Sequence, residues 1–89
     1  MLNGGTVDFC VNVLPPGESS GTFPAHRAGV EVTLAVASGS LRLHLADAVY
    51  ELRAGDSVFY RAHVSHRFDN PSSREPAIFY IVINNAGGN

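Results

Sequence analysis

The chain has 89 residues, 45% of them hydrophobic, with six Arg, eight acidic residues and a formal net charge of −2. This length fits one domain near the lower limit for burying an adequate core, so we expect a homodimer to add stability. The Arg residues form no basic stripe for nucleic acid, no apolar run is long enough to cross a bilayer and no signal peptide is present, which together predict a cytoplasmic protein.

The first predicted strand covers residues 7–13 and follows a flexible start. Its apolar residues alternate with polar ones, which is typical of a half-buried strand; they are Val7, Phe9, Val11 and Val13. Cys10 is the single cysteine, so an internal disulfide and cysteine-pair zinc sites are excluded, and we expect a small buried side chain. The next segment, PPGESSGT, is rich in turn residues and predicts a poorly ordered surface loop or a pocket lid.

A second strand is predicted in EVTLAVASG, which starts at Glu31 and ends at Gly39. Because side chains alternate across a strand, Val32, Leu34 and Val36 share one apolar face. Glu31 and Thr33 belong to the opposite face.

A hairpin is predicted in SLRLHLADAVYELRAG, with the turn at residues 46–48. Leu41, Leu43 and Leu45 alternate with Arg42 and His44. We therefore expect His44 to be an exposed residue on the polar face, without a functional role.

The segment GDSVFYRAHVSHRFDN, residues 55–70, reads as a turn, a strand covered on both faces, a second turn and another strand. Period two places His66, Phe68 and Asn70 on one face of this last strand, while His63 is expected to be solvated in the turn. The final run, AIFYIVI, is apolar on both faces of the predicted strand. Both faces must therefore be covered, as in a sandwich or a subunit interface.

Six to nine short strands without helical periodicity predict an all-β fold, an antiparallel double-sheet β-barrel of the jelly-roll kind. We expect one domain over residues 1–89, with its core at about 6–83 and frayed ends at 1–5 and 84–89. Such barrels keep a small cavity between the sheets, into which His66 and Phe68 would point.

At residues 55–70 the chain resembles a known family. The spacing of Gly55, His66 and Asn70 is similar to the second conserved motif of the cupin superfamily, although Arg61 and His63 stand where that motif usually has proline and glycine. The region from about residue 15 to residue 82 resembles the cupin sensor domain of bacterial helix-turn-helix regulators, most clearly in ELRAGDSVFY and HRFDNPSSREPA. This resemblance implies the cupin type of jelly roll.

The first cupin motif is only partly present. Metal-binding cupins carry two histidines one residue apart, then a glutamate, then a glycine that ends the next strand. Here the segment PAH supplies His26 alone, followed by Glu31 and Gly39. Counting back from Gly39 puts the usual glutamate position on Val32, so we expect Glu31 to point away from the cavity unless a bulge near Gly29 shifts the register.

The resemblance implies that His26 converges with His66 in the cavity. The expected ligand-binding residues are His26, Val32, Leu34, Val36, Tyr60, His66 and Phe68. A divalent metal (Zn, Mn, Fe or Ni) would need His26, His66 and an inward Glu31.

Two functions follow as hypotheses. The first is a small-molecule-binding cupin domain, the effector-sensing module of a bacterial transcription regulator or a stand-alone relative, with no direct nucleic-acid contact by this domain. The alternative is a small metal-dependent cupin enzyme of the dioxygenase or isomerase type. The partial first motif and the lack of a second inward carboxylate favour the binding domain over catalysis.

Overall fold

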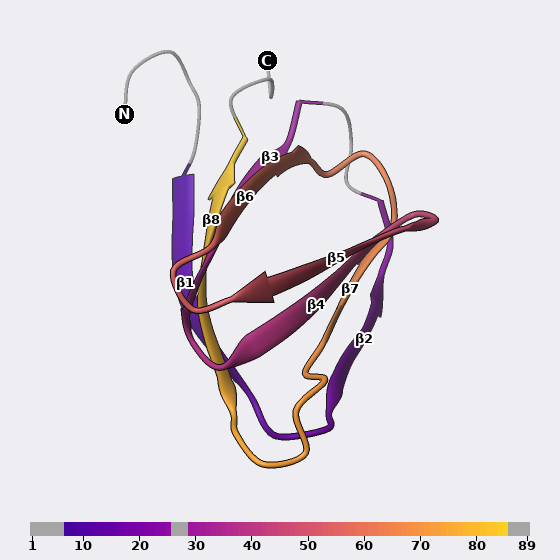
Figure 1. Ribbon diagram of the computed structural model, residues 1–89. Coiled ribbons are helices and arrows are strands. Elements are labelled where there is room, and N and C mark those ends of the chain that lie inside the picture. The colour runs from indigo at the N-terminus through magenta and orange to yellow at the C-terminus, as the bar shows by residue number, and fades with distance from the viewer. Residues whose placement is uncertain (1–6, 26–28, 86–89) are drawn as a thin grey trace.

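The computed structural model describes residues 7–25 and 29–85, and in this part of the chain every regular element is a β-strand (Figure 1). The strands are β1 (Val7–Leu14), β2 (Ser19–Phe23), β3 (Glu31–Ser38), β4 (Ser40–Leu45), β5 (Ala48–Arg53), β6 (Ser57–Arg61), β7 (His66–Asp69) and β8 (Ala77–Asn84). No helix in the described ranges is long and apolar enough to span a membrane.

The strands form two antiparallel four-stranded sheets that lie face to face. Sheet A has the order β1-β8-β3-β6 and sheet B the order β2-β7-β4-β5. The pairs β1 with β8, β2 with β7, β3 with β6 and β4 with β5 are nested, as in one long hairpin rolled into two layers. This order is consistent with a jelly roll. The two expected sheets are present, and in the described residues no hydrogen-bonded ladder joins them into a barrel.

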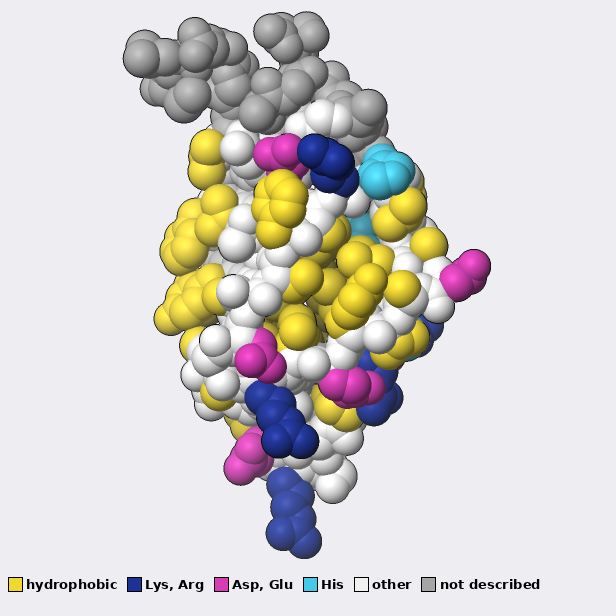
Figure 2. All heavy atoms as spheres, turned by 45° about the horizontal axis from the view of Figure 1, so that its top comes forward, with side chains coloured by type: hydrophobic (Ala, Val, Ile, Leu, Met, Phe, Trp, Pro, Cys, Tyr) yellow, Lys and Arg dark blue, Asp and Glu magenta, His cyan; other side chains and the backbone are white. Residues whose placement is uncertain are grey.

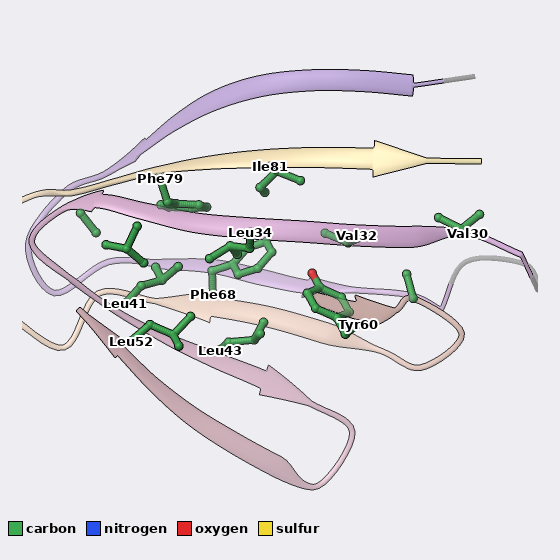
Figure 3. Packing of buried hydrophobic residues seen from close by; sticks show 13 residues of the cluster. Val30, Val32, Leu34, Leu41, Leu43, Leu52, Tyr60, Phe68, Phe79 and Ile81 are labelled. Atoms are coloured by element: carbon green, nitrogen blue, oxygen red, sulfur yellow. The ribbon is translucent and has the colours of Figure 1, made fainter. Parts of the chain in front are cut away.

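The core lies between the sheets, where the strand pleat directs alternate side chains inward. Leu34, Leu41 and Leu43 are fully buried, and Figure 3 shows them between aromatic residues from β6, β7 and β8. The strand faces predicted for β3 and β7 are confirmed by burial, since Val32, Leu34 and Val36 are buried on β3.

One end of the sandwich, which we call the closed end, contains the connections β1–β2 and β7–β8 (lower part of Figure 1). Asn70 joins these connections. Its Nδ2 donates to the carbonyl oxygens of Leu14 (3.0 Å) and Glu75 (2.8 Å), with Pro15 O at 3.3 Å, and its Oδ1 accepts from the Ser72 amide (2.9 Å).

Gly39 brings the β3–β4 turn against the same end. Its φ is +78°, and a Cβ at this position would lie 2.3 Å from the Pro76 carbonyl oxygen. Only glycine combines the left-handed backbone with this close approach. The opposite end, where β3 begins and β8 ends, is called the open end below.

Two expectations from the sequence are corrected by the structure, and a third is tested only for one face of a strand. The segment predicted as a loop contains β2, which is irregular between Ser19 and Thr22 and pairs with β7. The strand β6 is not covered on both faces, because Phe59 is 56% exposed. The outer face of β8 is not covered within this chain, since Tyr80 is exposed, so the sandwich accounts for the cover of the inner face alone.

Candidate functional site

A cavity of about 210 Å³ lies between the sheets at the open end. Among the described residues its walls are apolar apart from the side chains of Tyr60 and His66; they are Phe23, Val32, Tyr60, His66, Phe68, Ile81 and Ile83. These residues come from five strands, and each occupies an inward position of the pleat or the end of a strand. Figure 2 shows a hollow on this side of the molecule that is lined by hydrophobic side chains.

His66 opens β7 and is 7% exposed. Its ring stacks on Phe23 at a centroid distance of 5.3 Å and meets Phe68 and Tyr60 in tilted contacts at 5.9 and 6.2 Å. Its Nδ1 lies 3.4 Å from the Val64 carbonyl oxygen, a long contact in which a protonated Nδ1 donates. The aromatic neighbours fix the plane of the imidazole at the cavity wall.

Tyr60 contributes its side chain to the cavity wall from β6. It is the register partner of Val32 on the neighbouring strand β3, and it lies inside the cluster shown in Figure 3. The hydroxyl oxygen is buried and has no hydrogen-bond partner among the described residues. Burial raises the pKa of Tyr60 to about 12, so the phenol is neutral at physiological pH and its O–H is a donor. An unsatisfied buried donor costs about 1–3 kcal/mol.

Glu31 does not face this cavity. It lies on the outer face of β3, opposite Arg61 of β6, and its Oε2 is 4.0 Å from Arg61 Nε. The ladders of β3 with β6 and β8 run without a bulge from Glu31 to Val36, so Val32 takes the inward position. Gly29 therefore does not shift the register of this strand.

The described residues do not fit a metal centre. Glu31 lies on the outer face of sheet A, whereas His66 of sheet B lines the cavity between the sheets, so the two cannot bind the same ion. Within residues 7–25 and 29–85 no group of three His, Cys, Asp or Glu side chains is close enough to hold a metal. His26, expected as a metal and ligand contact, lies outside the described residues. A metal needs three or four donors, and the described residues place the His66 imidazole alone at the cavity.

A second, polar pocket of about 120 Å³ lies on the outer face of sheet B, beside His44 and Arg67. His44 is not the exposed residue that the sequence suggested. Its Nε2 is 2.8 Å from Asp69 Oδ2, and Arg67 Nη2 donates to the same oxygen at 3.1 Å. Because a carboxylate only accepts, this geometry fits a proton on His44 Nε2.

Desolvation of the Asp69 carboxyl by itself would raise its pKa, but the hydrogen bonds and the charge around it together lower the pKa by more. Hydrogen bonds from Ser19, Arg67 and His44, with the charge of Arg67, hold the pKa of Asp69 below its usual value. Asp69 is therefore ionised at neutral pH and organises a small charged network on this surface.

The structure brings four of the expected ligand-binding residues together at the cavity: Val32, Tyr60, His66 and Phe68. Leu34 and Val36 share the face of Val32 but lie further along the strand, in the core rather than at the cavity wall. Phe23, Ile81 and Ile83 line the cavity and were not expected. Phe23 follows a segment rich in turn residues, and β8 is apolar on both faces, so no local pattern identified them.

Comparison with known proteins gives a consistent result. Residues 11–83 match the family model described as Cupin domain. The solved Cupin_2 domain of an XRE family transcriptional regulator from Enterobacter cloacae is 30% identical with a TM-score of 0.80, and the match covers 86% of this chain and 79% of that chain. No curated protein matches.

Two further solved structures show the range of proteins with this fold. An HTH_3 family transcriptional regulator from Vibrio cholerae is 17% identical with a TM-score of 0.76, covering 86% of this chain and 42% of that one. A predicted oxalate decarboxylase from Thermotoga maritima is 27% identical with a TM-score of 0.73, covering 84% of this chain and 63% of that one. The chain thus spans less than half of the Vibrio regulator and somewhat less than two thirds of the Thermotoga protein.

Proposed function

Because this chain belongs to the cupin domain family, we propose that it is a ligand-binding domain whose small-molecule ligand occupies the cavity at the open end. The observation that carries the proposal is the buried Tyr60 hydroxyl, which has no partner among the described residues and belongs to a side chain that lines an otherwise apolar cavity together with His66. A few polar groups in an apolar cavity are the usual design of a small-molecule site.

The cavity also restricts the chemistry of the ligand. Its volume of about 210 Å³ equals that of about seven water molecules in the liquid, so the ligand is small. The described residues of the walls include no Lys, Arg, Asp or Glu, so they would not repay the desolvation of an ion. The ligand is therefore a neutral compound, mostly apolar, with one carbonyl or ether oxygen that accepts the Tyr60 hydrogen bond.

In its biological setting, the domain senses an effector for a bacterial transcription regulator, or is a stand-alone relative of such a domain. The 30% identity to the cupin domain of the Enterobacter regulator supports this role. Ligand binding would change the affinity for DNA of a linked domain by favouring one dimer geometry, with no contact of the cupin domain to DNA. We place this activity in the cytoplasm, and we take the sandwich as a jelly-roll barrel on the basis of its strand order.

The alternative is a metal-dependent enzyme of the dioxygenase or isomerase type. It is supported by the similarity to the Thermotoga protein, a predicted oxalate decarboxylase. The outward Glu31 argues against it, because it leaves the two-histidine, one-carboxylate set incomplete.

The experiment uses two ring compounds of similar size. Cyclohexanone offers a carbonyl acceptor, and methylcyclohexane offers none. We expect the wild-type chain to bind cyclohexanone about tenfold more tightly than methylcyclohexane, and Tyr60→Phe to lose this preference. Binding is measured by NMR titration, with Tyr50→Phe as the control, since Tyr50 is exposed on β5.

Equal binding of both compounds by the wild-type chain, or an unchanged preference in Tyr60→Phe, would contradict the proposed ligand class. Elemental analysis of the same protein tests the alternative. A near-stoichiometric metal that is lost in His66→Ala would favour the enzyme over the metal-free sensor.

A further inference from the structure

The polar pocket on the outer face of sheet B is not used by the proposed function. It lies at the open end, where β4 ends and β7 begins, and its volume is about 120 Å³. Its lining residues are Thr22, His44, Ala46, Ser65, His66 and Arg67. Apart from Ala46, each has a side chain that can donate a hydrogen bond. No Asp or Glu of the described residues lines the pocket, so its wall suits a ligand that accepts hydrogen bonds.

The strand register places three of these side chains in one row. Arg67 of β7 is the register partner of Thr22 on β2 and of His44 on β4. Register partners project from the same side of a sheet, with Cβ atoms about 4.5–5.5 Å apart. His66 and Phe68, the neighbours of Arg67 along β7, are buried on the inner face, so the row lies on the outer face. The backbone ladders of three strands therefore hold the row in place.

Arg67 provides the positive charge of the pocket. Its Nη2 donates to Asp69 Oδ2 at 3.1 Å and lies 3.1 Å from His44 Nε2. The other terminal nitrogen, Nη1, makes no hydrogen bond among the described residues, and the side chain is 39% exposed. A guanidinium can bind an oxyanion through two parallel N–H groups, and Asp69 uses only one of its terminal nitrogens. Part of the guanidinium is therefore left for a second oxyanion.

Asp69 lies beside this row without lining the pocket. Its Oδ2 accepts from Arg67 and from His44, at 2.8 Å for His44, so it holds the two basic side chains next to each other. It also offsets part of the Arg67 charge. Arg42, on the same face of the sheet, is paired with Glu51 at 2.6 Å and adds little. An anion in the pocket therefore meets one positive charge that is partly compensated, and we expect an affinity in the millimolar range.

We propose that the polar pocket binds a phosphate group, either as inorganic phosphate or as the monoester of a small molecule. The pocket volume of about 120 Å³ equals that of about four water molecules in the liquid, which suits one phosphate group. Arg67 binds its oxygens through the guanidinium, whose planar fork matches phosphate geometry. The hydroxyl groups of Thr22 and Ser65 are further donors in the lining. The inner cavity takes a neutral compound, so the two sites select ligands of different charge.

The test is an NMR titration of the full chain with sodium phosphate at pH 7, with sodium chloride keeping the ionic strength constant. We expect saturable shifts of the Thr22, Ser65 and Arg67 amide signals, with a Kd of about 1–10 mM. Arg67→Gln should raise this Kd about tenfold or more, because it removes the charge and the paired donors. The matched control is Arg42→Gln, on the same face but outside the pocket lining, and it should change the Kd by less than about twofold.

Shifts that do not saturate, or that sodium chloride alone reproduces, would overturn the proposal, because they would indicate ionic screening and no site. Equal losses of affinity in Arg67→Gln and Arg42→Gln would also overturn it, since the whole face would then attract anions. Thr22→Val covers the case in which Arg67→Gln does not fold. It removes a hydroxyl of the pocket lining and should raise the Kd about threefold or more. An unchanged Kd in Thr22→Val would mean that phosphate binds elsewhere and would contradict the proposed site.

Methyl phosphate distinguishes the two sources of the phosphate group. If it binds as tightly as inorganic phosphate and shifts the same signals, the pocket accepts a monoester, which supports the phosphate group of a small molecule as the ligand. If only inorganic phosphate binds, the free ion is the ligand, and the proposed site also stands. The signals of Phe68 and Ile81 monitor the inner cavity in the same titration. Saturable shifts of these two signals without shifts at Thr22 and Arg67 would overturn the proposal.

Discussion

The two ends of the sandwich differ in whether their buried polar groups are hydrogen-bonded within the described residues. At the closed end, the Asn70 amide bonds to backbone groups of both connections, and Gly39 lets two chain segments touch. At the open end, the Tyr60 hydroxyl has no partner in the described residues and the walls leave a cavity of about 210 Å³.

Because of this difference, the closed end contributes stability and the open end offers a place to bind a ligand, although both belong to one small core. Packing and satisfied hydrogen bonds at the closed end stabilise the fold. The unfilled space and the unused donor at the open end lower the stability of the free domain, and they are what a ligand can use.

The largest expected effect is at the closed end, from Gly39→Ala. The new Cβ would meet the Pro76 carbonyl oxygen at 2.3 Å in a backbone with φ of +78°. We expect the free energy of unfolding, measured in urea, to fall by about 3–4 kcal/mol, since strain and overlap act together.

Gly21→Ala is the matched control, because Gly21 also has a φ of +78° but no atom near its Cβ position. It should cost about 1 kcal/mol from backbone strain alone. Equal losses in the two variants would show that the approach to Pro76 is unimportant.

The second largest loss of stability is expected at the same end, from Asn70→Ala. Asn70→Ala removes the donor to the Leu14 and Glu75 carbonyl oxygens and the acceptor of the Ser72 amide. We expect a loss of about 2–3 kcal/mol in urea unfolding. Asn12→Ala, at a half-buried Asn of β1, should cost less than about 0.5 kcal/mol. A small loss at Asn70 would remove the contrast between the two ends.

At the open end, removal of a buried polar group should leave the stability of the fold unchanged or raise it. Tyr60→Phe deletes a buried hydroxyl that has no partner in the described residues. Thermal unfolding of the free protein should therefore show unchanged stability or a gain of up to about 1 kcal/mol. Tyr50→Phe should lie within about 0.5 kcal/mol of the wild-type chain. A clear loss of stability in Tyr60→Phe would mean that the hydroxyl has a structural role.

The smallest effect is expected at the outer face of sheet B, which belongs to neither end. The pKa of Asp69 is lowered in the folded protein, so its ion pair stabilises the fold above the unfolded pKa of about 4. This contribution is lost as the pH falls through the lower, folded-state pKa. At pH 7 we expect Asp69→Asn to cost less than about 1 kcal/mol, because the pair is partly exposed.

Urea unfolding from pH 7 to pH 2 measures this dependence. The difference between the wild-type chain and Asp69→Asn should shrink as the pH falls below about 4. Asp47→Asn, at the exposed β4–β5 hairpin, is the control for the charge change alone. A difference that does not depend on pH would contradict the role of the Asp69 charge.

Apart from β2, the strands of the described residues and most of their faces were predicted from the sequence, because alternation is a local property. It placed His66 and Phe68 on one inward face and Val32 on another, and the structure brings all three to the cavity. It did not predict that Leu34 and Val36 lie in the core instead, since alternation gives the face of a strand and not the depth along the sandwich.

Long-range pairing explains the remaining differences. Phe23 reaches the cavity because β2 pairs with β7, where Phe23 lies opposite His66. His44 hydrogen-bonds to Asp69 on β7, a strand far along the sequence. Such partners depend on the order of strands in the sheet, which local periodicity does not contain.

The pairing of β1 with β8 has one more consequence. Val7 and Asn84 are register partners, so the start of β1 and the end of β8 lie side by side at the open end. A chain joined to either strand there would start close to the cavity. A short linker between the two strands, with a new start at the exposed Ala46–Asp47 hairpin, should give a circular permutant that keeps both sheets.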